Sequence, residues 1–161
     1  MKQEKNRRTL ERFLPMQVRA VEEGEDNRVF ELSFSSEEPY MRWFGPEILD
    51  HSGEACDLSR LQELGVVLFN HDRNAVLGKI TRAWIEDNRG KAEIAFDDDE
   101  FAETIRKKVA GGTLRGVSVG YRVDNWEEVT AGGTSVDGRF TGPCSIARHW
   151  LPYEVSIVSV P

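Results

Sequence analysis

Residues 77–123 read LGKITRAWIEDNRGKAEIAFDDDEFAETIRKKVAGGTLRGVSVGYRV, and this stretch decides the predicted fold. Two segments of alternating apolar and polar residues, 77–86 and 91–96, flank the turn Asp87-Asn88-Arg89-Gly90. Alternation with period two is typical of half-buried strands. Because Asn and Gly in the turn tolerate positive φ, the two segments are predicted to form a β-hairpin.

A helix is predicted directly after this hairpin. The three aspartates at 97–99 offer N-cap acceptors and negative charge at the positive end of the helix dipole. Apolar residues then recur every four positions from Phe101 to Val109, and Gly111 marks the end of the helix. The sequence returns to a strand pattern over residues 114–123.

Similar patterns on either side extend this unit into a strand-rich domain. The further predicted elements are a hairpin of 16–22 and 29–34 around a turn at 23–27, a buried strand at 65–69, a weak helix at 58–64, a mobile loop at 131–143, and a last strand pair at 146–150 and 154–160. The expected fold is mainly β with a few α-helices (α+β), as a closed or nearly closed antiparallel β-barrel flanked by helices. Closure would remove the exposed edges of so many strands. We expect a flexible N-terminal segment, 1–14, followed by one domain, 15–161.

Composition excludes several classes of protein. The chain has 161 residues, of which 39% are hydrophobic and 30% charged, as in a globular domain. Lys and Arg number 21 against 28 Asp and Glu, and the net charge of −7 argues against a nucleic-acid partner. No stretch approaches the roughly 20 apolar residues of a membrane span, so no membrane partner is expected. Two cysteines are too few for a disulfide framework, and no secretory signal is recognised, which predicts a cytosolic protein.

Two residues stand out as candidates for nucleophilic chemistry, which needs a nucleophile and a base within hydrogen-bond reach. His71 follows the apolar strand in Phe69-Asn70-His71-Asp72, where a rigid scaffold can aim its ring, although a surface turn would also explain it. Ser118 lies in a strand between Gly116 and Gly120. Glycine inside a strand often marks the close approach of a ligand or another backbone, and the alternative is a small residue under a crossing element.

Other candidates are less distinctive. Glu154 precedes an apolar run, where a carboxylate is costly unless it is paired with a histidine or an arginine. His149 lies in a strand and could face either side, whereas His51 in a polar loop is expected at the surface. A zinc site is not predicted, because no CxxC or HExxH spacing occurs, and no cofactor is expected.

Three motifs in order give the sequence a family resemblance. They are an apolar strand ending in Asn70-His71-Asp72, the segment Gly116-Val117-Ser118-Val119-Gly120-Tyr121, and the terminal Glu154-Val155-Ser156-Ile157-Val158. With this order the chain resembles the phage prohead (capsid maturation) serine proteases, which are related in fold to the herpesvirus assembly proteases. The resemblance runs from about residue 41 to residue 161 and implies a herpesvirus-protease-like barrel.

The resemblance also implies roles and partners. Ser118 would be the nucleophile of an endopeptidase, His71 its general base and Glu154 the third member, with His149 or His51 as alternatives to Glu154. Arg122, backbone amides near Gly120, or Arg148 would stabilise the oxyanion.

The implied substrates are capsid protein and scaffold, cut inside the assembling prohead in the host cytoplasm, and the enzyme would also cut itself. A homo-oligomer, such as a dimer, is expected. The alternatives are a catalytically inert capsid- or scaffold-binding module of the same fold and a hydrolase of small esters.

Overall fold

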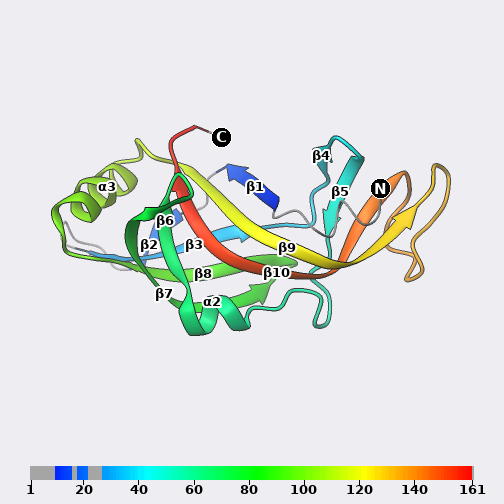
Figure 1. Cartoon of the computed structure of the whole chain (residues 1–161), viewed down its shortest axis with the longest axis horizontal. Helices are drawn as coiled ribbons and strands as arrows, with labels where there is room; N and C mark the ends of the chain where they lie inside the picture. Colours follow the sequence, from blue (N-terminus) through cyan, green and yellow to red (C-terminus); the bar gives the residue numbers. More distant parts are fainter. Residues whose placement is uncertain (1–9, 16–17, 22–26, 161) are drawn as a thin grey trace.

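The computed structural model describes residues 10–15, 18–21 and 27–160. They form a mainly β structure with two helices, so the α+β prediction is confirmed (Figure 1). The strands are β1 (Leu10–Pro15), β2 (Val18–Ala20), β3 (Val29–Ser35), β4 (Tyr40–Arg42), β5 (Gly45–Leu49), β6 (Val66–Phe69), β7 (Asp72–Glu86), β8 (Arg89–Phe96), β9 (Gly116–Val129) and β10 (Cys144–Val158). The helices are α2 (Ser59–Leu64) and α3 (Glu100–Ala110).

One sheet contains all of these strands, in the order β1-β9-β10-β6-β7-β8-β3-β2, with β5 pairing to β10 and β4 to β5. Strand β10 lies at its centre: it is antiparallel to β9 along its whole length, and it is parallel to β5 near its start and to β6 near its end. In Figure 1, β9 and β10 cross the molecule side by side, with α3 at one end. The sheet is otherwise antiparallel, and the predicted antiparallel arrangement does not hold at the β10 ladders with β5 and β6.

The expected barrel is not confirmed. The path of hydrogen-bonded strands ends at β1 and at β2, and within residues 10–15, 18–21 and 27–160 no ladder joins these two strands. The sheet is open in this part of the chain. The edge problem that motivated the barrel is reduced in another way, because one edge strand, β2, has only three residues.

The hairpin and the helix that decided the predicted fold are both present. Strands β7 and β8 pair antiparallel, and the two turn residues with positive φ are Asp87 and Asn88, while Gly90 lies inside β8. The side chain of Asp99 caps α3 by accepting a hydrogen bond from the amide of Ala102. The weak helix is also present, as α2.

Two predicted boundaries differ from the structure. Residues 10–14, expected to be flexible, form most of β1, which pairs antiparallel with β9 from Leu10 opposite Tyr121 to Pro15 opposite Gly116. Residues 1–9 of that segment, and residues 23–26 of the turn predicted at 23–27, lie outside the described residues. The predicted last strand pair is one continuous strand, β10, because irregularities near His149 and Pro152 interrupt its register without ending it.

The core forms around the middle of this sheet. Its largest fully buried side chains include Trp150 and Tyr121, whose rings pack edge to face at 5.7 Å. Strand β10 is buried along most of its length, as expected for a strand with neighbours on both edges and cover on both faces. Glu154, one of the candidate residues described below, lies on this buried strand.

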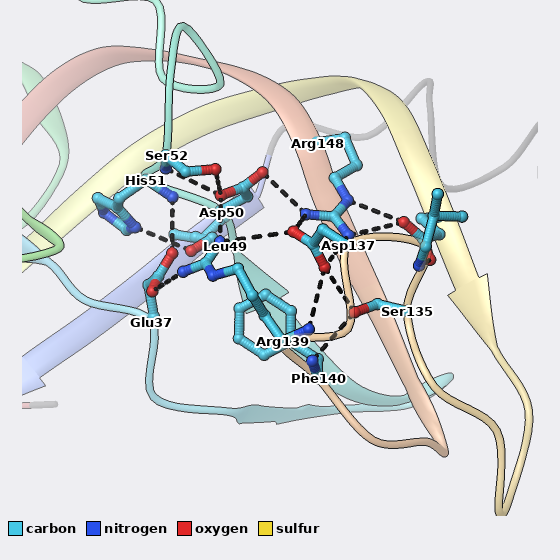
Figure 2. A network of polar contacts seen from close by, with 12 residues as sticks. Glu37, Leu49, Asp50, His51, Ser52, Ser135, Asp137, Arg139, Phe140 and Arg148 are labelled. Carbon is cyan, nitrogen blue, oxygen red and sulfur yellow. Dashed lines mark hydrogen bonds and ion pairs between the residues drawn. The ribbon is translucent and has the colours of Figure 1, made fainter.

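The predicted mobile loop, between β9 and β10, is held by ion pairs (Figure 2). Arg148 contacts Asp50 and Asp137, each at 3.0 Å, while Arg139 bridges Asp50 and Glu37. The guanidinium of Arg148 lowers the pKa of Asp137, together with the hydroxyl of Ser135. This network ties the loop to the end of β5.

Both cysteines, Cys56 and Cys144, are free thiols. Among the residues that the structure describes, neither helix has the length and apolar character needed to cross a bilayer.

Candidate active site

A two-residue turn positions His71. Strand β6 ends at Phe69, which pairs with Asp72 at the start of β7, so that Asn70 and His71 form the whole connection. Both have positive φ, 52° and 59°, as a tight hairpin turn of this length requires. Asn70 fixes the turn because its backbone N–H donates a hydrogen bond to the carbonyl of Ile157. A histidine in the left-handed region is uncommon, and such residues gather at functional sites.

Ser118 and Glu154 come from the two long neighbouring strands. In the β9–β10 ladder, Ser118 lies opposite Ser156 and Gly120 lies opposite Glu154. Alternate residues of a strand share a face, so these four residues lie together on one side of the sheet. The parallel pairing of β6 with β10 brings the His71 turn to the same place, since Phe69 pairs with Ile157.

The three side chains form a continuous hydrogen-bond chain. His71 Nε2 is 2.7 Å from Ser118 Oγ, and His71 Nδ1 contacts Glu154 Oε1. With the ring proton on Nδ1, donated to Glu154, Nε2 is left free to accept the hydroxyl proton of Ser118. Chemically, this arrangement provides a nucleophile, a base within reach of it, and a carboxylate that orients the base.

Ser156 contacts two members of this hydrogen-bond chain, Glu154 and His71. Its hydroxyl donates to Glu154 Oε2 at 2.9 Å and accepts the backbone N–H of His71 at 3.1 Å. One side chain therefore fixes both the carboxylate and the backbone of the histidine turn.

The site combines burial with negative charge. Ser118 is 5% exposed and Glu154 8%, while the His71 side chain is 19% exposed, so the ring lies at the mouth of the site. The hydrogen bond that His71 donates to Glu154 raises the pKa of His71 above its ordinary value against the opposing effect of burial, and the negative charges of Glu154 and Glu11 act in the same direction. A raised pKa makes His71 a stronger proton acceptor.

Glu11, on strand β1, is a fourth group beside the ring. Its Oε2 is 3.6 Å from His71 Nε2, and its side chain is 58% exposed. Its backbone is fixed by Arg42, which donates to the carbonyl of Glu11 and to the hydroxyl of Tyr121. The edge strand β1 thus contributes a carboxylate at the open side of the site.

The other two histidines lie apart from these residues. The ring of His149 is 2.6 Å from Asp124, and both side chains are exposed. His51 is buried, contrary to the expectation of a surface position: Nδ1 lies 2.8 Å from the carbonyl of Leu49, and Nε2 lies 2.7 Å from Ser35 Oγ. Burial lowers the pKa of His51. The position next to His71 Nδ1 is taken by Glu154.

The candidates for oxyanion stabilisation occupy different places. Gly120 is next to the site, and a Cβ added there would lie 2.7 Å from Glu154 Oε1. Arg122 is four residues along β9 from Ser118 and lines a separate pocket. Arg148 belongs to the ion-pair network of Figure 2. The assignment of a group that stabilises the oxyanion remains a prediction.

Sequence reasoning missed Ser156 and Glu11. Ser156 could have been found from the period of two, because it follows Glu154 by two residues and so shares its face of β10. Glu11 carries no local signal, since its approach to His71 depends on the pairing of β1 with β9. Among the described residues, no group of three or more His, Cys, Asp or Glu side chains is placed to bind a metal ion.

Comparison with known families agrees with the resemblance. The model of the caudovirus prohead serine proteases matches residues 15–161. The chain belongs to the caudovirus prohead serine protease family. It is also 36% identical over 133 residues to the major capsid protein of Halomonas phage phiHAP-1. This match covers 80% of this chain but only 21% of the capsid protein. The chain thus spans about a fifth of the length of this capsid protein. No solved structure matches it.

Proposed function

We propose that this chain is a serine endopeptidase of capsid maturation, with Ser118 as nucleophile, His71 as general base and Glu154 as the orienting carboxylate. The observation that carries the proposal is the hydrogen-bond chain from Ser118 through His71 to Glu154. Membership of the prohead protease family supports the same role.

The reaction would be acyl transfer in two stages. His71 Nε2 takes the hydroxyl proton as Ser118 Oγ bonds to the scissile carbonyl carbon, and the resulting imidazolium is stabilised by Glu154. That proton then passes to the leaving amine as the C–N bond breaks, which leaves an acyl-enzyme on Ser118. In the second stage His71 removes a proton from water, the hydroxide attacks the ester carbon, and the proton returns to Ser118 as the acid product leaves.

The proposed substrate is the scaffold, or a scaffold-like segment of the capsid protein, cut inside the assembling prohead in the host cytoplasm. The name of the family and the capsid-protein relative support this assignment. Cleavage of the chain itself and a homo-oligomeric state remain predictions from the resemblance.

A fluorophosphonate probe tests the serine chemistry without knowledge of the substrate. We expect labelling of the chain that is lost in Ser118→Ala and in His71→Ala. The matched control is Ser35→Ala, which removes a serine hydroxyl that contacts a different histidine ring, in the buried Ser35–His51 pair, and should keep the label. Labelling that persists in Ser118→Ala would overturn the assignment.

The second candidate function is a catalytically inert module that binds capsid or scaffold strands. The match to a protein named major capsid protein favours it. Incubation with scaffold or capsid protein separates the two functions: new fragments that are absent with Ser118→Ala support the protease. Stable binding with neither fragments nor fluorophosphonate labelling supports the module. Turnover of p-nitrophenyl esters without peptide cleavage would identify an esterase.

A further inference from the structure

A basic pocket lies beside the candidate active site. It has a volume of about 190 Å³ and is lined by Arg60, Arg73, Arg122 and Tyr153. These residues come from four elements, α2, β7, β9 and β10. The three guanidinium groups therefore meet through the tertiary fold and not through a local run of charge.

The pocket lies next to the proposed catalytic residues. Arg122 shares its face of β9 with Ser118, because the two are four residues apart, and Arg73 follows His71 by two residues. Tyr153 precedes Glu154, and its ring lies against Gly120, where an added Cβ would be 2.9 Å from the ring carbons. A substrate held at Ser118 would pass close to the pocket.

The arginines of this pocket differ from others in the fold. Six other guanidinium groups are paired with carboxylates, at Arg12, Arg28, Arg42, Arg106, Arg139 and Arg148. Within the part of the chain that the structure describes, Arg60, Arg73 and Arg122 have no ion pair or hydrogen bond, and all three are exposed. In a chain with a net charge of −7, three unpaired guanidiniums converging on one pocket leave a site that is complementary to an anion.

We propose that this pocket binds an acidic side chain, Asp or Glu, of the peptide substrate, and so determines which bonds are cut. The proposal rests on the proposed protease function. Guanidinium groups bind carboxylates through paired, charge-assisted hydrogen bonds, which give orientation as well as affinity. The position next to the catalytic residues favours a group carried by the substrate itself over a separate anionic ligand.

The spacing limits where the acidic residue stands in the substrate. Four residues of β9 separate Ser118 from Arg122, a distance of about 13 Å along a strand. An extended peptide advances roughly 3.3 Å per residue, so the acidic side chain lies within about four residues of the scissile bond.

Cleavage profiling tests this selectivity. The purified chain is incubated with a chymotryptic peptide library of a bacterial proteome, and the new termini are read by mass spectrometry. We expect Asp and Glu to be enriched at one position within four residues of the cut bond. In Arg122→Gln, Arg73→Gln and Arg60→Gln this enrichment should fall, whereas the control Arg19→Gln, which removes an arginine that is 77% exposed on the edge strand β2, should retain it.

A matched pair of peptides gives the magnitude. The best-cut peptide and its Asp→Asn or Glu→Gln analogue are compared by kcat/KM. We expect the acidic peptide to be preferred by about tenfold or more, because hydrogen bonds between charged groups are worth at least that factor, and Arg122→Gln should remove most of the preference. An equal loss on both peptides would overturn the pocket proposal, since a group acting on the scissile carbonyl affects all substrates alike.

Binding to Ser118→Ala separates failure of the pocket from failure of the protease function. By fluorescence anisotropy, the labelled acidic peptide should bind Ser118→Ala more tightly than Ser118→Ala/Arg122→Gln. If the wild-type chain cuts no peptide and is not labelled by fluorophosphonate, the proposed protease function is wrong. The binding measurement still tests whether the pocket prefers an acidic peptide. Equal binding of both peptides, or displacement by a dT12 oligonucleotide with no preference for the acidic peptide, would overturn the pocket proposal.

Discussion

Gly120 lies directly opposite Glu154 in the β9–β10 ladder, and a Cβ at residue 120 would come within 2.7 Å of Glu154 Oε1. The absence of a side chain on one strand thus creates the space for the carboxylate on the next. Gly120, which stood out in the sequence because it follows Ser118 by two residues, leaves room for Glu154, the carboxylate that contacts His71.

Gly120→Ala should therefore displace Glu154 and misplace the His71 ring. A misplacement of about 1 Å can cost roughly a hundredfold in rate, so we expect a loss of that order in the fluorophosphonate labelling rate. Gly111→Ala is the control, because the nearest atom to its added Cβ is 3.2 Å away, at the end of α3. A folded Gly120→Ala chain that is labelled as fast as the wild type would contradict this account of the glycine.

The pKa of His71 predicts the pH profile. Labelling needs the neutral ring, and Glu154 and Glu11 raise the pKa of His71 above 6.5, so the acid limb of the rate should lie above pH 6.5. Glu154→Gln removes the largest cause, and it should move this limb to lower pH and also reduce the plateau rate.

Glu11→Gln provides the comparison, since Glu11 contributes the smallest of the effects that raise the pKa of His71. It should move the acid limb in the same direction by a smaller amount. A limb that does not move in Glu154→Gln would show that another group controls the profile.

Ser156→Ala tests the residue that links the carboxylate to the histidine turn. It leaves the N–H of His71 and one oxygen of Glu154 without this hydroxyl. Loss of such buried hydrogen bonds costs about 1–3 kcal/mol of the free energy of unfolding, measured by urea denaturation. The labelling rate should fall as well.

Ser145→Ala is the matched control on the same strand. Its hydroxyl also donates to a carboxylate, at 2.7 Å from Glu128, but on the half of β10 that faces β5. We expect a change in stability without a comparable change in labelling. Equal effects of Ser156→Ala and Ser145→Ala on the labelling rate would show that Ser156 contributes to packing but does not position His71.

A buried ion pair anchors strand β1 to the rest of the sheet. Arg12 and Glu47 are 3% and 0% exposed, and Glu47 also accepts a hydrogen bond from Tyr121. Arg12→Met leaves this carboxylate buried with one partner fewer, and the expected loss is about 3 kcal/mol of the free energy of unfolding. The measurement is urea denaturation at neutral pH.

Two further variants make this test specific. Arg28→Met removes a more exposed partner of Glu103 and should cost less than about 1 kcal/mol. The double variant Arg12→Met/Glu47→Gln should recover part of the loss, because it removes the uncompensated charge. Strict additivity of the two single changes would show that the pair does not interact energetically.

The features of the fold and of the site that depend on a local sequence pattern could be predicted from the sequence. The aspartates before α3 and the alternation of β7 and β8 are short-range signals, and both elements form as expected. His71 was found because it ends an apolar run, and Ser118 because glycines flank it.

The features that were missed depend on contacts between distant segments. The parallel pairing of β6 with β10 joins residues nearly 90 positions apart, for example Phe69 and Ile157, and no local pattern specifies it. The same applies to β1, where Arg12 is buried against Glu47 and Glu11 approaches His71 only because the strand adds to β9. The separation of His149 from His71 likewise follows from register, which single-strand alternation leaves undetermined.

The central position of β10 has a consequence for synthesis of the chain. Translation produces His71 and Ser118 well before Glu154 and Ser156, which arrive on the last strand of this sheet. While β10 is still inside the ribosome, His71 lacks its carboxylate and its turn lacks the hydroxyl that holds it. A nascent chain therefore lacks the complete hydrogen-bond chain from Ser118 through His71 to Glu154 until the strand at the middle of its sheet has been inserted.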